Sequence, residues 1–325
     1  AMLVWLDGRS NTKDKPQENF GRELMELFTF GVEHYVETDV YAAARVFSGW
    51  NLAATGVKGT ASAYQGFTYV PARHDTAAKD FSFPIYPGGS TRIEPRSATG
   101  GMQDGLDLIN ALVLHPETAR RLARRLWTWF VSETDNAPDD FVDAISSVYL
   151  QNDTNMKPVV RAVLFSKYFV DPARQFQRYS WPVEYVVRSL KEVGYLGFSV
   201  NDALTPLVNM GQQLFEPPDV NGWDLGPGWF STGGMLARMN FASLLATNQK
   251  FALREAARPA KASPDTLVDF VLGALSVPQA ITDLRPTLVE YVQKGTAWTG
   301  SDAQLLTKTA GLVHLVIGSG EYQIA

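Results

Sequence analysis

Residues 18–31, ENFGRELMELFTFG, combine three glutamates with a helical pattern of large apolar side chains. At about 100° per residue, the apolar stripe of this helix is centred near Phe20 and Leu24. Asn19 and Glu23 lie on the flanks of the stripe, where a side chain is half-buried. A half-buried glutamate needs a partner or a raised pKa. The pattern therefore makes Glu23 the leading candidate for a catalytic carboxylate and Asn19 a candidate substrate contact.

The other charged residues of this helix lie on its far side. Glu18, Arg22 and Glu26 follow one another at i, i+4 and i+8, which is the spacing of intrahelical ion pairs. A solvated charge ladder explains all three. The alternative assigns Glu26 as a second catalytic carboxylate and Arg22 as a substrate-binding cation.

The next helix, expected over TDVYAAARVFSGW, brings two more candidates. Asp39 has the position of a helix N-cap, and it is also a candidate catalytic partner of Glu23. Arg45 lies one turn before Trp50. It can pair with Glu23 or Glu26 across a helix contact, or it can bind an anionic or hydroxylated ligand beside the Trp50 ring.

Residues 51–100 are rich in Gly, Ser, Thr, Pro and aromatic residues, so we expect a long irregular excursion with short strands near GFTYV and DFSFPIY. It contains His74, Asp75 and Lys79. The ordinary pKa of histidine makes His74 a candidate general acid or base, which Asp75 can orient and to which Lys79 can add a substrate contact. The alternative is a histidine that anchors the loop by hydrogen bonds.

A second irregular stretch, residues 216–234, contains EPPDVNGWDLGPGW. Asp219 and Trp223 have the chemistry of a sugar-binding surface, in which a ring covers the apolar face of the sugar and polar groups bind its hydroxyls. The alternative is a rigid loop whose prolines and tryptophans pack onto the helices.

Composition excludes several classes of protein. The net charge is −5 and the pI about 5.5, without the basic footprint of a nucleic-acid-binding protein. No apolar run has the roughly 20 residues of a membrane span. There is no cysteine, and the four histidines do not share helical metal-ligand spacing, so we expect no Cys- or His-ligated metal and no cofactor, while a carboxylate-bound Ca²⁺ or Mg²⁺ stays open.

The remaining periodicity is helical and predicts a mainly α protein, a multi-helix array with long irregular loops and at most a few short strands. We expect a helical core domain over residues 1–250 and a C-terminal helical subdomain over 260–325 packed on it, with a hinge at REAARPAKASPDT. The expected helices are residues 16–29, 38–48, 102–114, 116–132, 139–150, 156–166, 182–193, 202–214, 233–248, 264–275, 284–294 and 302–317.

Several motifs occur in the order found in a known family. These are PQENFGRELMELFTFG, AARVFSGW, RHDTAAKDF, HPETARRLARRLWTWFV, WPVEYVVRSL and GQQLFEPPDVNGW. The chain resembles the bacterial domain-of-unknown-function family 1800 over most of residues 1–250. Family members usually carry further residues before this block, and many have histidine where Phe28 stands. The resemblance implies an exported bacterial protein but no reaction.

Two functions remain open from the sequence. The first is a hydrolase acting on glycosidic bonds, with Glu23 as acid and Asp39, Glu26 or Asp75 as partner; the separation of the two carboxyl groups, ~5–5.5 Å or ~6.5–9.5 Å, would then set retention or inversion. The second is a non-catalytic exported binding or assembly protein with a structural Glu/Arg network. In both, the partner is a carbohydrate or another small polar ligand, and a second copy or the preceding segment can complete the site.

Overall fold

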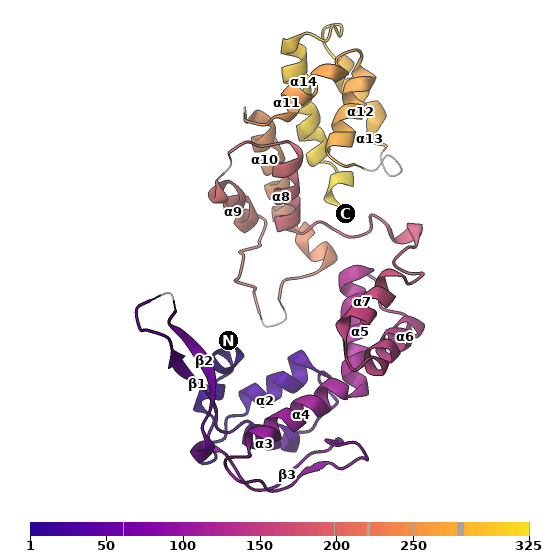
Figure 1. Cartoon of the computed structure of the whole chain (residues 1–325). Helices are drawn as coiled ribbons and strands as arrows, with labels where there is room; N and C mark the ends of the chain where they lie inside the picture. Colours follow the sequence, from indigo (N-terminus) through magenta and orange to yellow (C-terminus); the bar gives the residue numbers. More distant parts are fainter. Residues whose placement is uncertain (61, 198, 220–221, 249, 278–282, 325) are drawn as a thin grey trace. The chain divides into compact units, whose positions relative to one another are not determined.

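The computed structural model describes residues 1–60, 62–197, 199–219, 222–248, 250–277 and 283–324. It falls into two compact units (Figure 1). Unit 1 comprises residues 1–131 and 135–170, and unit 2 comprises residues 132–134 and 171–325. The break expected from sequence between residues 250 and 260 falls inside unit 2.

Unit 1 is built from helices and two small sheets. Its elements are α1 (Met2–Trp5), α2 (Asn19–Glu23) with a π-helical turn (Leu24–Phe28), α3 (Glu37–Val46), β1 (Trp50–Thr55), β2 (Tyr64–Tyr69), β3 (Lys79–Asp80), β4 (Arg92–Ile93), α4 (Met102–Leu114), α5 (Pro116–Phe130), α6 (Asp139–Gln151) and α7 (Met156–Leu164).

Both sheets lie in the irregular excursion after α3. Strands β1 and β2 pair antiparallel, with Trp50 opposite Tyr69, and the two-residue strands β3 and β4 pair with Lys79 opposite Ile93. The strand expected near GFTYV is present as β2, whereas DFSFPIY contributes only its first residue, Asp80, to β3. The excursion is ordered mainly by side-chain contacts rather than by a sheet.

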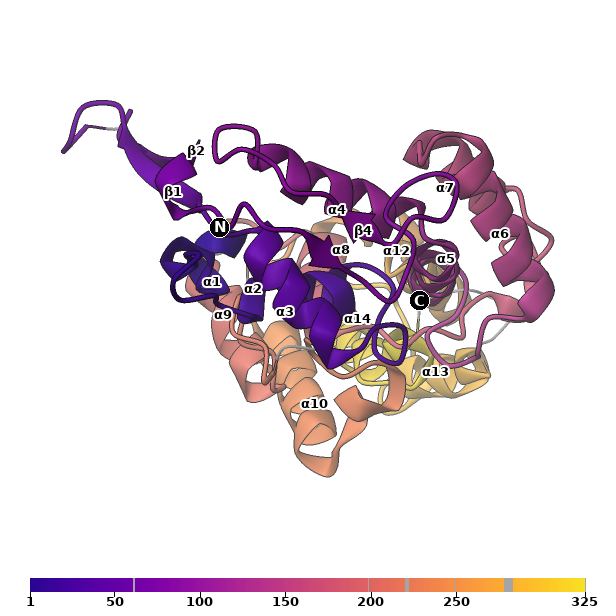
Figure 2. The same ribbon diagram turned by 90° about the horizontal axis from the view of Figure 1, so that it is seen from below.

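Unit 1 has two apolar cores. Phe20, Met25, Val40, Phe47 and Leu108 belong to the core that α2, α3 and α4 share. The second core lies where α5, α6 and α7 pack side by side (Figures 1 and 2) and includes the fully buried ring of Trp127. His115 separates α4 from α5. Its ring accepts a hydrogen bond from Glu117 N at 3.2 Å and so caps the start of α5.

The named secondary-structure elements of unit 2 are all helices or 3₁₀ turns in its described residues. Its helices are α8 (Pro182–Glu192), α9 (Val200–Asn209), α10 (Thr232–Thr247), α11 (Leu253–Ala256), α12 (Pro264–Ala274), α13 (Leu284–Gln293) and α14 (Asp302–Ile317). Their apolar faces form one core, in which α10 packs on α14 and α12 on α13. The expected hinge, residues 254–266, contains α11 and a 3₁₀ turn (Arg258–Ala260).

The prediction of a mainly α fold is confirmed, and ten of the expected helices recur from 102 onward with small shifts at their ends. The largest shift is in α9, which ends at Asn209 instead of 214 because Gly211 adopts a positive φ of 91°. The opening helix differs in kind, since its second half is a π-helical turn.

Candidate functional site

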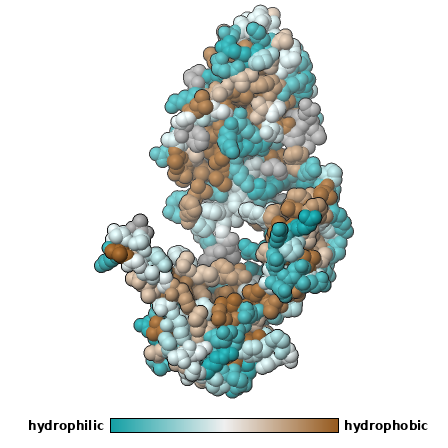
Figure 3. Space-filling view, in the orientation of Figure 1, coloured by the Kyte–Doolittle hydropathy of each residue, from teal (hydrophilic) through white to brown (hydrophobic). Residues whose placement is uncertain are grey.

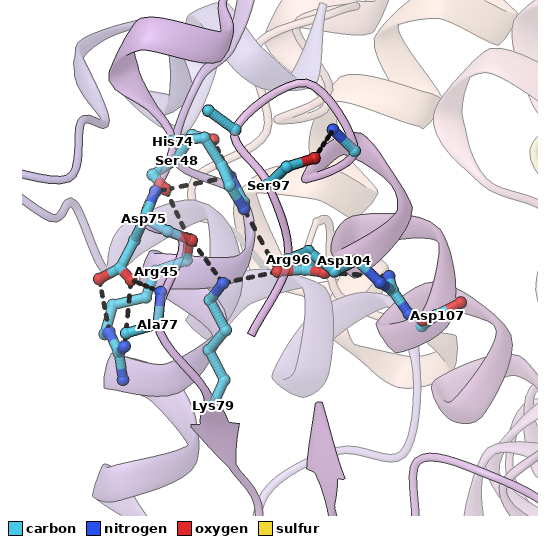
Figure 4. A network of polar contacts seen from close by, with 12 residues as sticks. Arg45, Ser48, His74, Asp75, Ala77, Lys79, Arg96, Ser97, Asp104 and Asp107 are labelled. Carbon is cyan, nitrogen blue, oxygen red and sulfur yellow. Dashed lines mark hydrogen bonds and ion pairs between the residues drawn. The ribbon is translucent and has the colours of Figure 1, made fainter. Parts of the chain in front are cut away.

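A buried polar network occupies the middle of unit 1, with Asp104 at its centre (Figure 4). The Lys79 ammonium donates to Asp104 Oδ2 at 2.5 Å, and His74 Nε2 lies 3.2 Å from the same oxygen. Arg96 Nη1 donates to the other oxygen, Oδ1, at 3.0 Å. The side chains of His74, Lys79 and Asp104 are fully buried. Three donors therefore converge on one carboxylate that water does not reach.

Local backbone structure places each member of this network. Asp104 lies in the first turn of α4, His74 follows a 3₁₀ turn (Pro71–Arg73), and Lys79 begins β3. Gly101 permits the close approach, because a Cβ there would lie 2.0 Å from His74 Cδ2. A residue without a side chain is thus required where α4 starts.

The His74 ring is held at both nitrogens. Nδ1 lies 2.8 Å from the carbonyl oxygen of Ser48, and Nε2 faces Asp104. Both partners are oxygen atoms, so each ring nitrogen lies beside a hydrogen-bond acceptor. The ring fixes the end of α3 and the start of α4 to the excursion, which is the anchoring alternative stated above for this histidine.

A second carboxylate, Asp75, extends the network toward α3. Arg45 donates to it through Nε at 2.8 Å and Nη2 at 3.1 Å, a bidentate pair. Asp75 also accepts from Ala77 N at 2.9 Å. Arg45 therefore pairs with Asp75, and the pairing with Glu23 or Glu26 expected as one alternative is wrong.

The pKa values of the carboxyl groups follow from these contacts. Burial alone would raise the pKa of Asp104, but hydrogen bonds from His74 and Lys79 outweigh it and hold the pKa below its usual value. Asp75 and Asp107 likewise have lowered pKa values, against burial, through Arg45 and through Gln103, Tyr86 and Arg96. All three are ionised partners of fixed cations.

The candidate residues of α2 and of the π-helical turn after it do not belong to the Asp104 network. Arg22 donates to Glu37 Oε1 at 2.5 Å and to Glu18 Oε2 at 3.4 Å, while Glu26 accepts from the Tyr35 hydroxyl at 2.8 Å. The ladder is therefore present between Glu18 and Arg22, and it does not extend to Glu26.

Glu23 is half-buried, as the stripe predicts, and its side chain has no hydrogen-bond or ion-pair partner among the described residues. Asn19, expected to be half-buried too, is exposed. The reason is that α2 begins only at Asn19, so its first residue is not covered by the preceding chain. Glu23 is thus the carboxylate of this helix that remains available to a ligand.

A π-helical turn, Leu24–Phe28, follows Glu23 directly. Its freed carbonyl groups are met by side chains: Thr29 Oγ1 donates to Leu24 O at 2.8 Å, and Arg121 Nη1 donates to Leu27 O at 2.8 Å. Such turns are rare and occur frequently at functional sites. The turn also leaves the Phe28 ring exposed.

Asp39 is a buried residue with a complete set of donors. It accepts from Val36 N at 2.9 Å, from Ser82 N at 2.7 Å and from Ser82 Oγ at 2.6 Å. Val36, not Asp39, is the N-cap residue of α3, and Asp39 closes the first turn from its third position. Its three bonds give the carboxylate a structural task.

The remaining candidates are dispersed. The Trp50 ring packs on Phe47 and Phe67 next to Gly105, with no partner for Nε1 among the described residues. Asp219 is exposed and its carbonyl oxygen accepts from Gly222 N, and Trp223 is half-buried. Both belong to unit 2, whereas the other candidates belong to unit 1.

The second part of the loop at residues 216–234, which contains Gly226 and Trp229, packs against Glu133 and Trp181. The Glu133 side chain is 5% exposed and accepts from Arg178 Nε at 2.8 Å, from Trp181 Nε1 at 3.1 Å and from Gly226 N at 3.2 Å. Trp229 is buried 6.0 Å from the Trp181 ring. The packing alternative therefore holds for this second part of the loop.

A pocket of about 520 Å³ lies within unit 2, where α8, α9 and α10 meet. Figure 3 shows hydrophobic surface on this part of the unit. The polar lining residues are Tyr195, Asn201, Asp202, Thr205, Asn209, Asn240 and Asn248. Apolar walls come from Leu190, Pro206, Leu236, Ala237, Phe241, Leu244 and Leu245, with Gly233 at one side.

Three amides of this lining are free to bind. The side chains of Asn201, Asn209 and Asn240 have no hydrogen-bond partner among the described residues. Asn248, in contrast, donates to the Tyr195 hydroxyl at 2.8 Å. Asp202 accepts from Ser199 N at 2.7 Å, as part of the cap of α9. The described residues that line the pocket thus offer neutral amide donors and acceptors beside one carboxylate, and none of them is Lys, Arg or His.

Sequence reasoning missed both Asp104 and the asparagines. Asp104 reads as an ordinary first-turn acid of a helix, and nothing in the sequence places it beside residues 74 and 79. The asparagines did carry a signal, since Asn201/Asn209 and Asn240/Asn248 each stand eight residues apart on neighbouring predicted helices. In the part of the chain that the structure describes, no group of three His, Asp or Glu is placed to hold a metal ion. No helix in that same part has both the length and the hydropathy to cross a membrane.

These features define a mainly α protein of two units, with a buried ionic network in one and an amide-lined pocket in the other. The chain belongs to the family described as Protein of unknown function (DUF1800), whose model matches residues 1–324. This confirms the resemblance drawn from the motifs. No curated protein and no solved structure matches the chain.

Proposed function

We propose that this chain is a binding protein, which takes a carbohydrate or another small neutral polar ligand in the pocket of unit 2. The observation that carries the proposal is the set of three free amides, Asn201, Asn209 and Asn240, around one pocket. A few convergent polar groups on apolar walls are typical of small-molecule sites, and the volume of about 520 Å³ is in their usual range.

The lining favours binding over catalysis. Each free amide supplies both a donor and an acceptor, but its groups do not titrate near neutral pH. The carboxylate in the lining, Asp202, is occupied by the cap of α9. Among the described residues that line the pocket, Asp202 has no histidine, lysine or second carboxylate beside it to complete an acid/base pair.

The test is a screen of neutral sugars, peptides and polyols against ¹⁵N-labelled protein, read by backbone amide shifts. Bound ligands should shift residues of α9 and α10, and Ala237→Trp, which fills the pocket, should abolish those shifts. Ala303→Trp, at an exposed position of α14, is the matched control. Ligands that bind Ala237→Trp as tightly as the parent protein would refute the proposal, as would a screen without any pocket shift.

A second candidate function, hydrolysis of glycosidic bonds with Glu23 as acid, is favoured by one observation. Glu23 is half-buried and unpartnered, directly before the π-helical turn, with Glu26 three residues on. If Glu23 carries catalysis, Glu23→Gln should abolish turnover of a cleaved glycan, whereas Glu18→Gln should not. Equal turnover in the two variants would exclude Glu23. Because Glu23 has no partner, we expect Glu23→Gln to leave stability nearly unchanged.

A further inference from the structure

We propose that the ligand of the unit 2 pocket is an extended peptide segment lying along α9 and α10, a proposal that rests on the binding function above. The spacing and the chemistry of the lining residues are the basis for this choice of ligand class. Neutral sugars and polyols are the alternative ligand classes for the same pocket.

The first argument is length. Asn201 and Asn209 are eight residues apart on α9, so they are separated by about 12 Å along the helix axis. Asn240 on α10 and Asn248, which directly follows the last residue of α10, are also eight residues apart. Because all four line one pocket, the pocket is at least that long. An extended peptide covers the distance with about four residues at ~3.3 Å each.

The second argument is the chemistry of the free amides. A primary amide carries an acceptor oxygen beside a donor NH₂ group, which is the complement of a peptide group with its own C=O and N–H. Asn209 and Asn240 come from different helices, so one peptide strand between them can be held from both sides. The amides then bind the backbone and leave the side chains of the peptide to the walls.

The third argument is the walls themselves. Leu236 and Leu244 stand eight residues apart on α10, repeating the spacing of the asparagines, and they are 59% and 64% exposed. Side chains on one face of an extended strand recur every ~6.6 Å, so two side chains that are four residues apart, at ~13 Å, match the ~12 Å between these leucines. Apolar or small side chains fit this surface.

The lining fits a sugar less well. Stacking of a sugar needs an open aromatic face, but of the aromatic residues that line the described pocket Phe241 is buried and Tyr195 is partly buried against the core. Trp223, the ring expected to serve this purpose, is not among the lining residues. An anionic ligand lacks a counter-charge in the described part of the pocket, because none of its lining residues there is Lys, Arg or His. A neutral peptide backbone remains the best match.

The experiment is selection of a random heptapeptide display library on the full chain, with depletion on an Asn209→Ala/Asn240→Ala double variant. Enriched sequences are made as acetylated, amidated peptides and their Kd values measured by calorimetry. Each single variant should weaken binding by about 3- to 10-fold, the effect of losing one neutral hydrogen bond. Asn110→Ala, an exposed position of α4 in unit 1, should leave Kd unchanged.

Backbone recognition has its own test. N-methylation of the central peptide groups removes their donors while keeping every side chain, so it should weaken binding at least as much as one asparagine substitution. The inference is overturned if no peptide is enriched over the double variant, or if enriched peptides tolerate N-methylation and both asparagine changes. If linear oligosaccharides bind the pocket and peptides do not, the inference fails while the binding function stands. If neither class shifts α9 and α10, both fail.

Discussion

The buried network of unit 1 predicts a large and specific loss of stability in Asp104→Asn. The substitution keeps the shape of the side chain and removes its charge, so the fully buried Lys79 ammonium loses its counter-ion at 2.5 Å. His74 and Arg96 lose the charge that they face as well. Breaking a buried ion pair from one side costs about 3–5 kcal/mol, because the remaining charge stays desolvated. For a unit of this size the melting temperature should fall by about 6–20 °C.

The assay is urea and thermal unfolding, combined with hydrogen exchange measured on peptides from residues 71–107. Exchange assigns the loss to unit 1 even if the two units unfold in separate transitions. Asp80→Asn is the matched control, because Asp80 pairs with Arg92 at 3.0 Å but is 67% exposed. This control should change stability by only a small fraction of the Asp104→Asn effect, since water screens the exposed pair.

A second variant keeps the reasoning testable if Asp104→Asn does not fold. Lys79→Met in the Asp104→Asn background removes the stranded charge and should recover part of the lost stability. The electrostatic account is refuted if Asp104→Asn costs no more than Asp80→Asn. It is also refuted if Asp104→Asn stabilises the protein, a result typical of strained functional residues.

Two further predictions concern the same network. Because the pKa values of Asp75, Asp104 and Asp107 are lowered in the folded state, their contribution to stability is complete above the unfolded pKa of about 3.9 and is lost as pH falls through the folded values. Urea midpoints of unit 1 should therefore drop steeply below about pH 4, and a pH-independent midpoint down to pH 2.5 would contradict the shifts. Gly101→Ala should destabilise unit 1 by about 1–3 kcal/mol or more, because the new Cβ overlaps the His74 ring. Gly273→Ala, in α12 with open space around it, should be neutral or slightly stabilising, and equal melting temperatures for the two alanine variants would show that the close approach relaxes freely.

The helices were predictable because their ends carry local signals. Pro116, Pro182 and Pro264 stand in first turns, and Ser263 and Ser301 cap α12 and α14 through their hydroxyls. These signals act within a few residues of each other, so they can be found in the sequence without knowledge of the tertiary structure. The π-helical turn has no such signal, because its side chains still follow the apolar stripe of an α-helix. The hydrogen bonds from Thr29 and Arg121 that sustain it come from outside the turn.

The candidate site was predictable only in part. The order of His74, Asp75 and Lys79 shows that polar residues gather in the excursion. The common partner of His74 and Lys79 is Asp104, which lies 25 residues beyond Lys79. Helical periodicity placed Glu23 at the edge of the stripe correctly. It failed for Asn19, because burial there depends on where the helix begins. Periodicity describes one helix at a time, whereas burial and pairing depend on which elements meet.

The division of the chain has a consequence for its biosynthesis. Residues 132–134 belong to unit 2, although the chain returns to unit 1 until residue 170 before it completes unit 2. Glu133 therefore emerges from the ribosome well before Arg178 and Trp181, whose donors it accepts. Until those residues have been synthesised, this glutamate must stay hydrated at the junction of α5 and α6. A fragment that begins at residue 171 would lack Glu133, and Arg178 and Trp181 would lose this acceptor. A fragment meant to reproduce unit 2 therefore also needs residues 132–134.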